Sequence, residues 1–135
     1  MNKPMPEITE VNRPFFEGCN HDELRLQHCQ EPNCGRYVYY PRVCCPYCGS
    51  ENLEWQKVSG RGRIVTSTII RRPQHESFFS EAPYFFIAVK LDEGPVIFSR
   101  LEGKATEELD LTQQAVEVVF VDHAPGQRLP FFRRC

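Results

Sequence analysis

Five of the seven cysteines in this chain lie close together, between residues 29 and 48. Four of them form two pairs that are each followed by glycine: a CxxxxCG pair that begins at Cys29 and a CxxCG pair that begins at Cys45. The turn within such a pair aims two sulfur atoms at one point, and the glycine lets backbone N–H groups approach them. Tetrahedral zinc takes four thiolates, so the pattern predicts one Zn²⁺ bound by Cys29, Cys34, Cys45 and Cys48.

The sequence leaves other roles for these side chains open. Cys44 is an alternative to Cys45, but only Cys45 keeps the CxxC spacing, and His28 is an alternative to Cys29. Free core thiols are compatible with the same residues. A CxxC redox pair is a further alternative, but such a pair usually opens a helix in a βαβ unit, which this sequence lacks. Four thiolates leave no place for an activated water, so the predicted zinc is structural.

No spacing in the sequence joins a nucleophilic thiol to a histidine. Outside the predicted zinc ligands, the candidates are Cys19, Cys44, Cys135, His21, His28, His75 and His123. Acyl-transfer chemistry by a cysteine needs a paired histidine and an oxyanion hole. We therefore expect the chain to have no catalytic residues of its own.

Two other groups of residues are candidates for binding a ligand or a partner. The first is a basic stretch without acidic residues, formed by Arg61, Arg63, Arg71 and Arg72. Arginine pairs well with phosphate and carboxylate oxygens, so this stretch suits a CoA diphosphate or an acidic partner, with ordinary strand-edge charge as the alternative. The second group consists of the aromatic pairs Phe78-Phe79 and Phe131-Phe132. One residue of each pair faces outward on a strand, so we expect partner contacts there, or caps on the ends of a barrel.

The rest of the sequence predicts a mainly β chain in three parts. Residues 1–23 form an arm and a short helix capped by Asn12, residues 24–52 the zinc ribbon, and residues 53–135 a barrel domain with a C-terminal tail. Strands are predicted at 63–70, 84–89, 96–101, 116–121 and 128–132, with 84–89 buried on both faces and a helical turn at 106–109. Five such strands fit a closed or nearly closed barrel, for which an OB-fold is the best match in size; an open sandwich is the alternative.

Composition limits the function classes. The chain has 16 basic and 18 acidic residues, a net charge of −2 and a pI of about 6.1. This balance disfavours single-stranded nucleic-acid binding, which an OB-fold and a zinc ribbon would otherwise suit. There is no apolar run of about 18 residues, so we expect no membrane association. The first ten residues lack the apolar segment of a secretory signal, so we expect a cytoplasmic protein with reduced thiols.

Taken in order, several short motifs resemble one family of small proteins, in which a rubredoxin-like zinc ribbon precedes an OB-fold. The motifs are Phe15-Phe16-Glu17, Leu24-x-Leu26-Gln27-x-Cys29, Pro41-Arg42-x-x-Cys45-Pro46-x-Cys48-Gly49-Ser50, Leu53-Glu54-Trp55, Val58-Ser59-Gly60-x-Gly62, Pro83-Tyr84, Leu91-Asp92-Glu93-Gly94 and Phe131. The resemblance extends from about residue 12 to residue 132. The chain departs from the family pattern in its longer first cysteine pair, usually CxxC, and at Thr112-Gln113-Gln114, where the family often has glycine.

The resemblance implies a role in acyl-CoA chemistry. Similar proteins are accessory subunits of thiolase-fold enzymes that make or cleave carbon–carbon bonds by Claisen or retro-Claisen chemistry, for example in aromatic, steroid or ketone catabolism. The thiolase-fold chain supplies the nucleophilic cysteine and the histidines. The zinc-ribbon and OB-fold chain docks on it and shapes the CoA channel, so the resemblance implies a hetero-oligomer that shares a CoA thioester.

Overall fold

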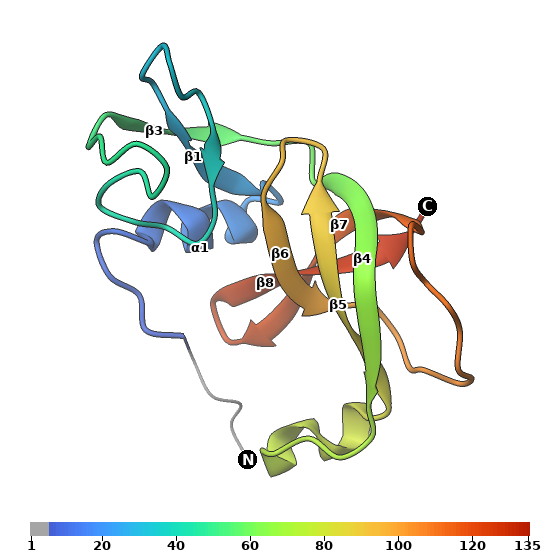
Figure 1. The fold of residues 1–135 in the computed structure, drawn as a ribbon. Coiled ribbons are helices and arrows are strands. Elements are labelled where there is room, and N and C mark those ends of the chain that lie inside the picture. The colour runs from blue at the N-terminus through green and yellow to red at the C-terminus, as the bar shows by residue number, and fades with distance from the viewer. Residues whose placement is uncertain (1–5) are drawn as a thin grey trace.

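The computed structural model describes residues 6–135 as a mainly β chain with a short N-terminal helix, as predicted. The elements are, in chain order, α1 (Arg13–Asn20), β1 (Arg25–Cys29), β2 (Tyr37–Val38), β3 (Leu53–Lys57), β4 (Arg61–Ile70), the 3₁₀ helix η1 (Glu76–Glu81), β5 (Tyr84–Leu91), β6 (Val96–Arg100), β7 (Ala115–Ala124) and β8 (Gln127–Arg134). Figure 1 shows that they form two sheets, with α1 beside both.

The smaller sheet carries the cysteine loops. Its strand order is β2-β1-β3, and both neighbours are antiparallel to β1. β3 pairs with the full length of β1, from Cys29 opposite Leu53 to Arg25 opposite Lys57. By its pairing, β3 therefore lies with the ribbon, although it follows the predicted division between residues 52 and 53.

The larger sheet curls into a nearly closed barrel. Its strand order is β6-β5-β4-β7-β8, and all neighbours are antiparallel. The two end strands meet where Leu101 bridges Phe132 and the Glu102 N–H donates to the Phe132 carbonyl at 2.7 Å. The Ser99 hydroxyl adds a 2.6 Å bond to the Pro130 carbonyl. The predicted five-stranded barrel is confirmed, and the open sandwich is wrong because these contacts join the sheet edges.

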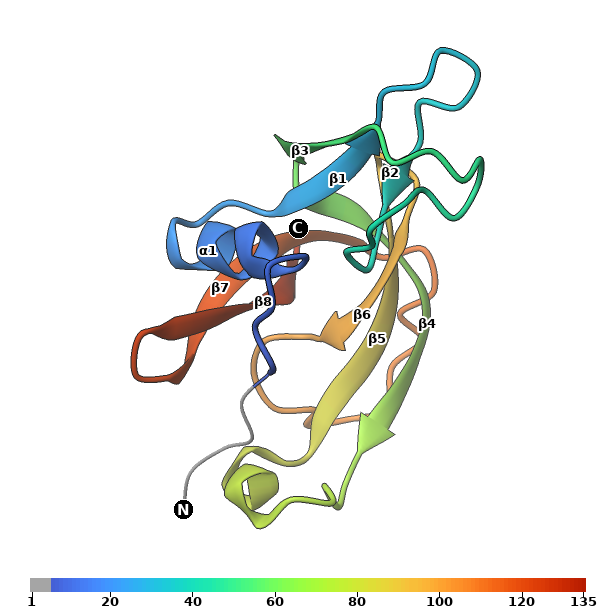
Figure 2. The ribbon, with the colours of Figure 1, turned by 90° about the vertical axis from the view of Figure 1, so that its left-hand side faces the viewer.

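One hydrophobic core joins helix, ribbon and barrel. Phe15, Phe16 and Cys19 of α1 pack into the same cluster as Leu26 of β1 and Ile64 of β4. Figure 2 shows α1 between the β1 sheet and the β7–β8 hairpin, and its buried side chains share one core cluster with Leu26 of β1 and Phe132 of β8. The helix therefore fixes the ribbon relative to the barrel through burial.

The start of α1 differs from the prediction. Asn12 precedes the helix, but its side chain makes no capping bond to it. Its Oδ1 accepts from the Thr9 N–H at 2.8 Å, and its Nδ2 donates to the Glu7 carbonyl at 3.0 Å. Asn12 therefore orders the arm before the helix, while Pro14 supplies the preset backbone angle of the first turn.

Two local predictions in the barrel are also wrong. Strand β5 is not buried on both faces, because Phe86 remains 41% exposed on its outer side. The run from Tyr84 to Val89 is apolar throughout because its outward residues are apolar as well as its inward ones. The predicted helical turn at 106–109 is absent, and that segment runs as an irregular loop between β6 and β7.

Cys19 should make the fold less stable in alkali. Burial raises the pKa of its thiol from 9.0 to about 12. The unfolded chain then releases this proton at lower pH than the folded chain, so the free energy of unfolding should fall as pH rises through 9 towards 12. We expect urea unfolding at pH 7, 9 and 10 to show a smaller alkaline loss for Cys19→Ala than for the wild type. Equal losses in the two proteins would contradict this origin.

Candidate zinc centre and exposed aromatic face

The two cysteine pairs meet at one point between their loops. The Sγ atoms of Cys29, Cys34, Cys45 and Cys48 all lie within 4.8 Å of one another. The Cys29–Cys48 and Cys34–Cys45 sulfur distances are 3.6 and 3.7 Å. Zinc–sulfur bonds of about 2.3 Å in a tetrahedron place the sulfurs about 3.8 Å apart. Donor type, number and spacing therefore fit a structural zinc ion.

Backbone bonds hold each cysteine loop in place. Cys29 ends β1, and its N–H donates to the Arg36 carbonyl at 2.9 Å across the first loop. In the second loop the Gly49 N–H donates to the Cys45 carbonyl at 2.8 Å. Gly49 has a φ of +82°, a conformation that other residues rarely adopt. The glycine after the CxxC pair thus lets the chain turn back over the sulfur atoms.

Electrostatics around the sulfurs favour a cation at their centre. Burial raises the pKa of Cys45, but the N–H groups of Tyr47 and Cys48 and the neighbouring thiols more than offset this and lower it to about 7. At Cys48, the Ser50 N–H lowers the pKa, whereas burial and hydrogen bonds with the other thiols raise it to about 12. Crowded thiols therefore cannot all ionise by themselves, and a divalent cation supplies the charge that lets four thiolates coexist.

The alternative ligands lie outside the cluster. Cys44 is exposed, whereas Cys45 is only 1% exposed and belongs to the sulfur group, as the CxxC spacing predicts. The Nδ1 atom of His28 lies 2.9 Å from the Gln30 amide, and its ring packs on Tyr37. Neither Cys44 nor His28 is therefore among the residues that could hold the metal.

The four arginines do not form one patch. Arg61 and Arg63 lie at the start of β4, whereas Arg71 and Arg72 follow its end. A ten-residue strand spans about 33 Å. Arg63 donates to the Gln113 carbonyl at 3.0 Å. Arg71 pairs with Glu108 at 3.1 Å. A diphosphate can reach one end of β4 but not both.

The predicted phenylalanine contacts divide into two groups. Phe79 of η1 is 52% exposed, and Phe78 stacks at 6.3 Å from His123. Phe131 lies under the Arg100 guanidinium at 4.8 Å. Phe132 is completely buried where the barrel closes, so its prediction as a partner contact is wrong. The two neighbours alternate across β8, and Phe132 is the one that faces inward.

Sequence reasoning missed an aromatic face on the outside of β5 and β6. Phe98 is 61% exposed and Phe86 41%, and their rings stack 6.3 Å apart and almost parallel. Val96, 40% exposed, lies in the same outward row of β6 as Phe98. The sequence does contain a signal for this face. Side chains alternate between the two faces of a strand, so Val96 and Phe98 point outward because Ile97 points inward. We call Phe86, Val96 and Phe98 the aromatic face.

Beside the aromatic face lies a groove of about 220 Å³, with Arg100 in its wall and Tyr84 and Phe131 among its lining residues. The Arg100 guanidinium stacks at 3.8 Å from the Tyr84 ring centre and pairs with Glu81 at 3.3 Å. The Arg100 side chain is 12% exposed, and desolvated arginine–aromatic contacts of this kind contribute more than exposed ones. Arg100 thus keeps the aromatic rings next to Phe86 in a fixed arrangement.

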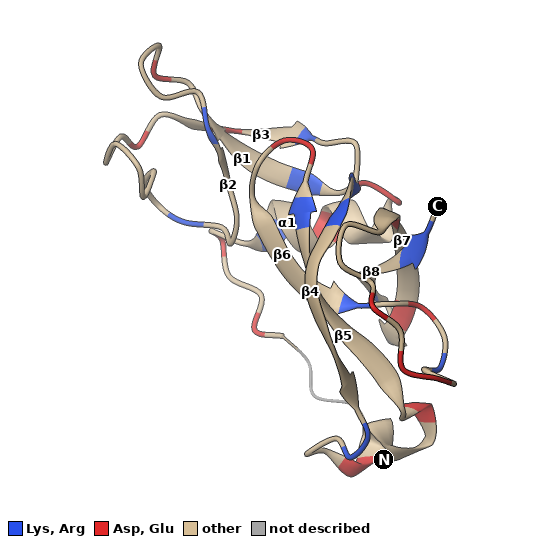
Figure 3. Ribbon diagram, turned by 45° about the vertical axis from the view of Figure 1, so that its right-hand side comes forward, with Lys and Arg blue, Asp and Glu red and all other residues tan. Residues whose placement is uncertain are grey.

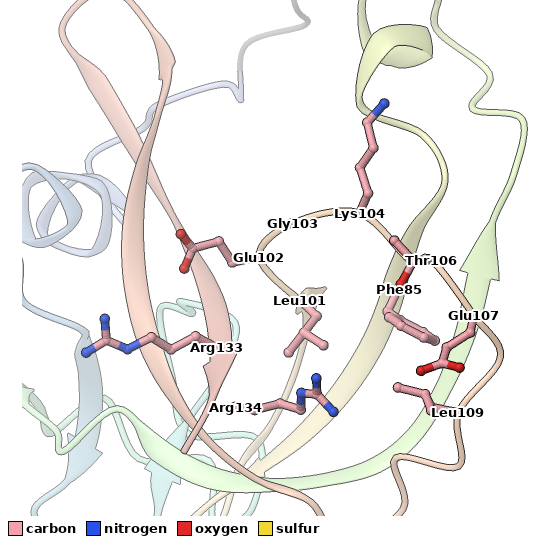
Figure 4. Close-up of a pocket in the computed structure, with 10 residues that line it drawn as sticks. All are labelled: Phe85, Leu101, Glu102, Gly103, Lys104, Thr106, Glu107, Leu109, Arg133 and Arg134. Atoms are coloured by element: carbon pink, nitrogen blue, oxygen red, sulfur yellow. The ribbon is translucent and has the colours of Figure 1, made fainter.

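Another hollow, of about 350 Å³, lies between the loop after β6 and the end of β8. Figure 4 shows Phe85, Leu101 and Leu109 in it, with the charged groups of Lys104, Glu107 and Arg134 around them. It contains neither a thiol nor a histidine. Within residues 6–135, the four cysteines are also the one group of His, Cys, Asp or Glu residues close enough to hold a metal.

Basic and acidic residues are interspersed along the chain. Figure 3 shows both kinds of position on the two sheets and their loops. In the part of the chain that the structure describes, no helix has the length and apolar character needed to cross a membrane.

Comparison with protein families matches both parts of the chain. Residues 16–54 match the rubredoxin-like zinc ribbon domain of ChsH2. Residues 55–121 match the C-terminal OB-fold domain of ChsH2. The two matches adjoin each other and together include all four clustered cysteines and strands β4 to β6.

Curated relatives carry two kinds of name. A DUF35 domain-containing scaffold protein of Pyrococcus furiosus is 37% identical over 121 residues, which are 90% of this chain and 81% of that protein. A probable enoyl-CoA hydratase alpha subunit of Thermomonospora curvata is 29% identical over 131 residues. This second match covers 97% of the present chain but 40% of the relative, so the chain spans less than half of that protein.

Solved structures also resemble the chain. The structure described as Ltp2-ChsH2(DUF35) aldolase contains a chain that superposes with a TM-score of 0.82 and 28% identity, over 96% of this chain and 98% of that one. A DUF35 protein of unknown function from Sulfolobus solfataricus superposes with a TM-score of 0.62 at 13% identity, over 93% and 86% of the two chains. The second likeness concerns the fold alone.

Proposed function

Because this chain belongs to the DUF35 family of ChsH2-type proteins, in which a rubredoxin-like zinc ribbon precedes an OB-fold, we propose that it is a non-catalytic accessory subunit of a thiolase-fold acyl-CoA enzyme. The observation that carries the proposal is the likeness, over nearly the full length of both chains, to a chain of Ltp2-ChsH2(DUF35) aldolase. That structure is described as an aldolase whose name joins Ltp2 and ChsH2(DUF35), and scaffold is the name given to the Pyrococcus relative.

The chain's own chemistry supports an accessory role. The four clustered cysteines fill a zinc coordination sphere and leave no open position for substrate. Cys19 is completely buried, with a pKa raised by burial, so it is a poor nucleophile. In this proposal the partner supplies the nucleophilic cysteine, histidines and oxyanion hole, and the present chain supplies shape and binding surface.

The proposed substrate class is a CoA thioester. The relative named a probable enoyl-CoA hydratase alpha subunit supports this class, since it shares 29% identity with almost all of the present chain. In the complex, the chain borders the CoA channel of the catalytic subunit. A phosphate oxygen of CoA can then bind at one end of β4. The arginines there are Arg61 and Arg63 at the start of the strand, or Arg71 and Arg72 after its end.

The aromatic face has the composition of a protein interface. Exposed aromatic side chains with an adjacent arginine are enriched in interface centres, where they contribute most of the binding free energy. Phe86 and Phe98 stack in parallel, and Arg100 stiffens the neighbouring Tyr84. We propose that the catalytic subunit covers this face.

A nucleic-acid strand is the second candidate for the aromatic face. OB-folds bind oligonucleotides on their second and third strands, here β5 and β6, and the exposed Phe86 and Phe98 lie there. Binding of a phosphate backbone also needs a basic groove. The Arg100 cation beside these rings already pairs with Glu81, and the net charge is −2. Charge therefore favours the protein partner.

Replacing Phe98 by serine should weaken the complex while the chain stays folded. Affinity purification of the tagged wild type from its native host, followed by mass spectrometry, should identify a thiolase-fold chain in a fixed ratio. With that purified chain, Phe98→Ser should raise the Kd by about ten-fold or more, as expected for an aromatic residue central to an interface. Val43→Ser is the matched control, because Val43 is 67% exposed but lies on the ribbon. A wild-type Kd for Phe98→Ser would exclude the aromatic face, and the absence of a thiolase-fold chain would exclude the proposed function.

A further inference from the structure

One edge of β4 is only partly paired. β7 pairs with β4 from Arg61 to Arg63. The loop before β7 adds a bond from the Gln113 N–H to the Ile64 carbonyl and one from the Ile64 N–H to the Gln114 carbonyl, at 2.8 and 3.0 Å. β4 then continues to Ile70, paired with β5 on its other side. Within residues 6–135, no further strand pairs with this edge beyond Ile64.

A bulge at Val65 decides which backbone groups point to the open edge. The register between β4 and β5 shifts between Ile64 and Thr66, which leaves Val65 as the extra residue. Before the bulge, the backbone groups of Ile64 point away from β5 and bond to the loop. After the bulge the alternation is offset by one residue, so the outward groups belong to residues 67 and 69.

The bonds of β5 confirm this assignment. The Phe85 carbonyl accepts from the Leu101 N–H, and the Leu91 N–H donates to the Pro95 carbonyl, so odd-numbered residues of β5 direct their backbone groups towards β6. Ser67 lies opposite Ile87 and Ile69 opposite Phe85. Both pairs are therefore of the non-hydrogen-bonded kind, and Ser67 and Ile69 present their N–H and carbonyl groups to the open edge.

The sequence does not protect this edge. Natural strand edges commonly carry lysine, other charged residues or proline, which prevent another strand from pairing. The stretch from Ile64 to Ile70 contains no charged residue and no proline. Five of its seven residues are isoleucine or threonine, and the other two are Val65 and Ser67. Such residues have high β-propensity, so the edge is suited to receive a strand.

A hollow of about 400 Å³ lies along the open edge. The residues that line it are Ser67, Thr68, Ile69, Arg71, Phe85, Glu108 and Leu109. Leu109 is 38% exposed, and Figure 4 shows it beside Phe85 where the loop passes β4. The ion pair between Arg71 and Glu108 joins the two sides, but these side chains are 65% and 84% exposed. Such a pair contributes little to stability and can open.

We propose that the open edge of β4 accepts an extended segment of the catalytic subunit as an additional β-strand. The inference rests on the proposed function and names the mode of contact. The outward groups of Ser67 and Ile69 are about 6.7 Å apart along the strand, a spacing that an extended peptide backbone matches. Alternate side chains of the added segment face Phe85 and Leu109, so the segment carries an apolar residue at that point.

Proline at residue 67 tests the added strand directly. Ser67→Pro removes an N–H that points to the open edge, while the bonds of Thr66 and Thr68 to β5 remain. We expect a Kd for the purified thiolase-fold partner at least ten-fold above that of the wild type. Ser67→Ala is the matched control, because it loses the same hydroxyl but keeps the N–H, and we expect wild-type binding. Zinc content and the urea midpoint of each variant show whether it is folded.

Amide hydrogen exchange of the wild-type chain gives a second measurement that needs no variant. In the free chain the amides of Ser67 and Ile69 should exchange fast and those of Thr66 and Thr68 slowly, and in the complex all four should be slow. Complex formation without new protection at Ser67 and Ile69, or a wild-type Kd for folded Ser67→Pro, would refute strand addition but leave the proposed function intact. Failure of any thiolase-fold chain to bind would refute both.

Discussion

Replacing Cys45 by serine will unfold the ribbon and abolish zinc binding. The ribbon has almost no core of its own: besides Cys29, Cys34 and Cys45, the apolar cluster around the metal site contains Val38 and Leu53. In zinc-finger peptides a structural zinc contributes on the order of 10–16 kcal/mol, which is comparable with the total stability of a domain. Loss of one thiolate from the closed set removes most of this contribution. Metal analysis should give one zinc per wild-type chain and none for Cys45→Ser.

The neighbouring cysteine provides the control. Cys44→Ser makes the same chemical change one residue away, at an exposed side chain outside the sulfur cluster. It should keep one zinc per chain and wild-type unfolding. In Cys45→Ser, amide exchange should show residues 29–53 losing protection while β4 to β8 keep theirs, because Leu26 of β1 and Leu24 just before it belong to the barrel core. A metal-free Cys45→Ser chain with a protected ribbon would contradict the structural role of zinc.

The zinc cluster was predictable because its information is local. Two pairs of cysteines and the glycines that follow them specify both ligands and turns, and Cys45 is distinguished from Cys44 by spacing alone. The number of barrel strands was likewise predictable from short apolar runs and turns. Family resemblance added the order of the two parts, and residues 16–54 and 55–121 match the corresponding ChsH2 domains.

Tertiary contacts set the limits of prediction. The sequence does not say that the side chain of Asn12 would bond to the arm at Thr9 instead of capping α1. Nor does the arginine stretch reveal that Arg63 bonds to the Gln113 carbonyl and that Arg71 pairs with Glu108. The bulge at Val65, which sets the backbone groups that face the open edge of β4, is a shift in the register between β4 and β5. Each of these features depends on a partner that is remote in sequence.

Sequence patterns do not show which side chains of β5 and β8 face the core. Residues 84–89 of β5 and 129–132 of β8 are apolar on both sides, so alternation of apolar and polar residues cannot show which residues point inward. Phe86 and Phe132 were therefore assigned to the wrong environments: the first is 41% exposed, the second 0%. An apolar residue on the outside of a barrel is itself informative, because a face that stays in water has little reason to carry stacked phenylalanines.

Replacing Phe132 by alanine will destabilise the barrel by about 3–5 kcal/mol, the usual cost of truncating a buried phenylalanine. Its ring is completely buried in the main core, and its backbone lies where the barrel closes. The Phe132 carbonyl accepts from the Glu102 N–H, and the residue bridges Leu101 of the opposite edge. A cavity at this place therefore loosens the seam between β6 and β8. Urea unfolding followed by circular dichroism should give the change in the free energy of unfolding.

The same truncation on the aromatic face separates core from interface. Phe98→Ala removes an identical ring from a side chain that is 61% exposed, so its change in unfolding free energy should stay within about 0.5 kcal/mol. The two variants should behave in opposite ways in binding: Phe98→Ala weakens the complex of a stable chain, whereas Phe132→Ala, where it remains folded, binds the partner with nearly the wild-type Kd. A large loss of stability in Phe98→Ala would mean that this ring supports the fold, and the aromatic face could then no longer be regarded as a surface kept for a partner.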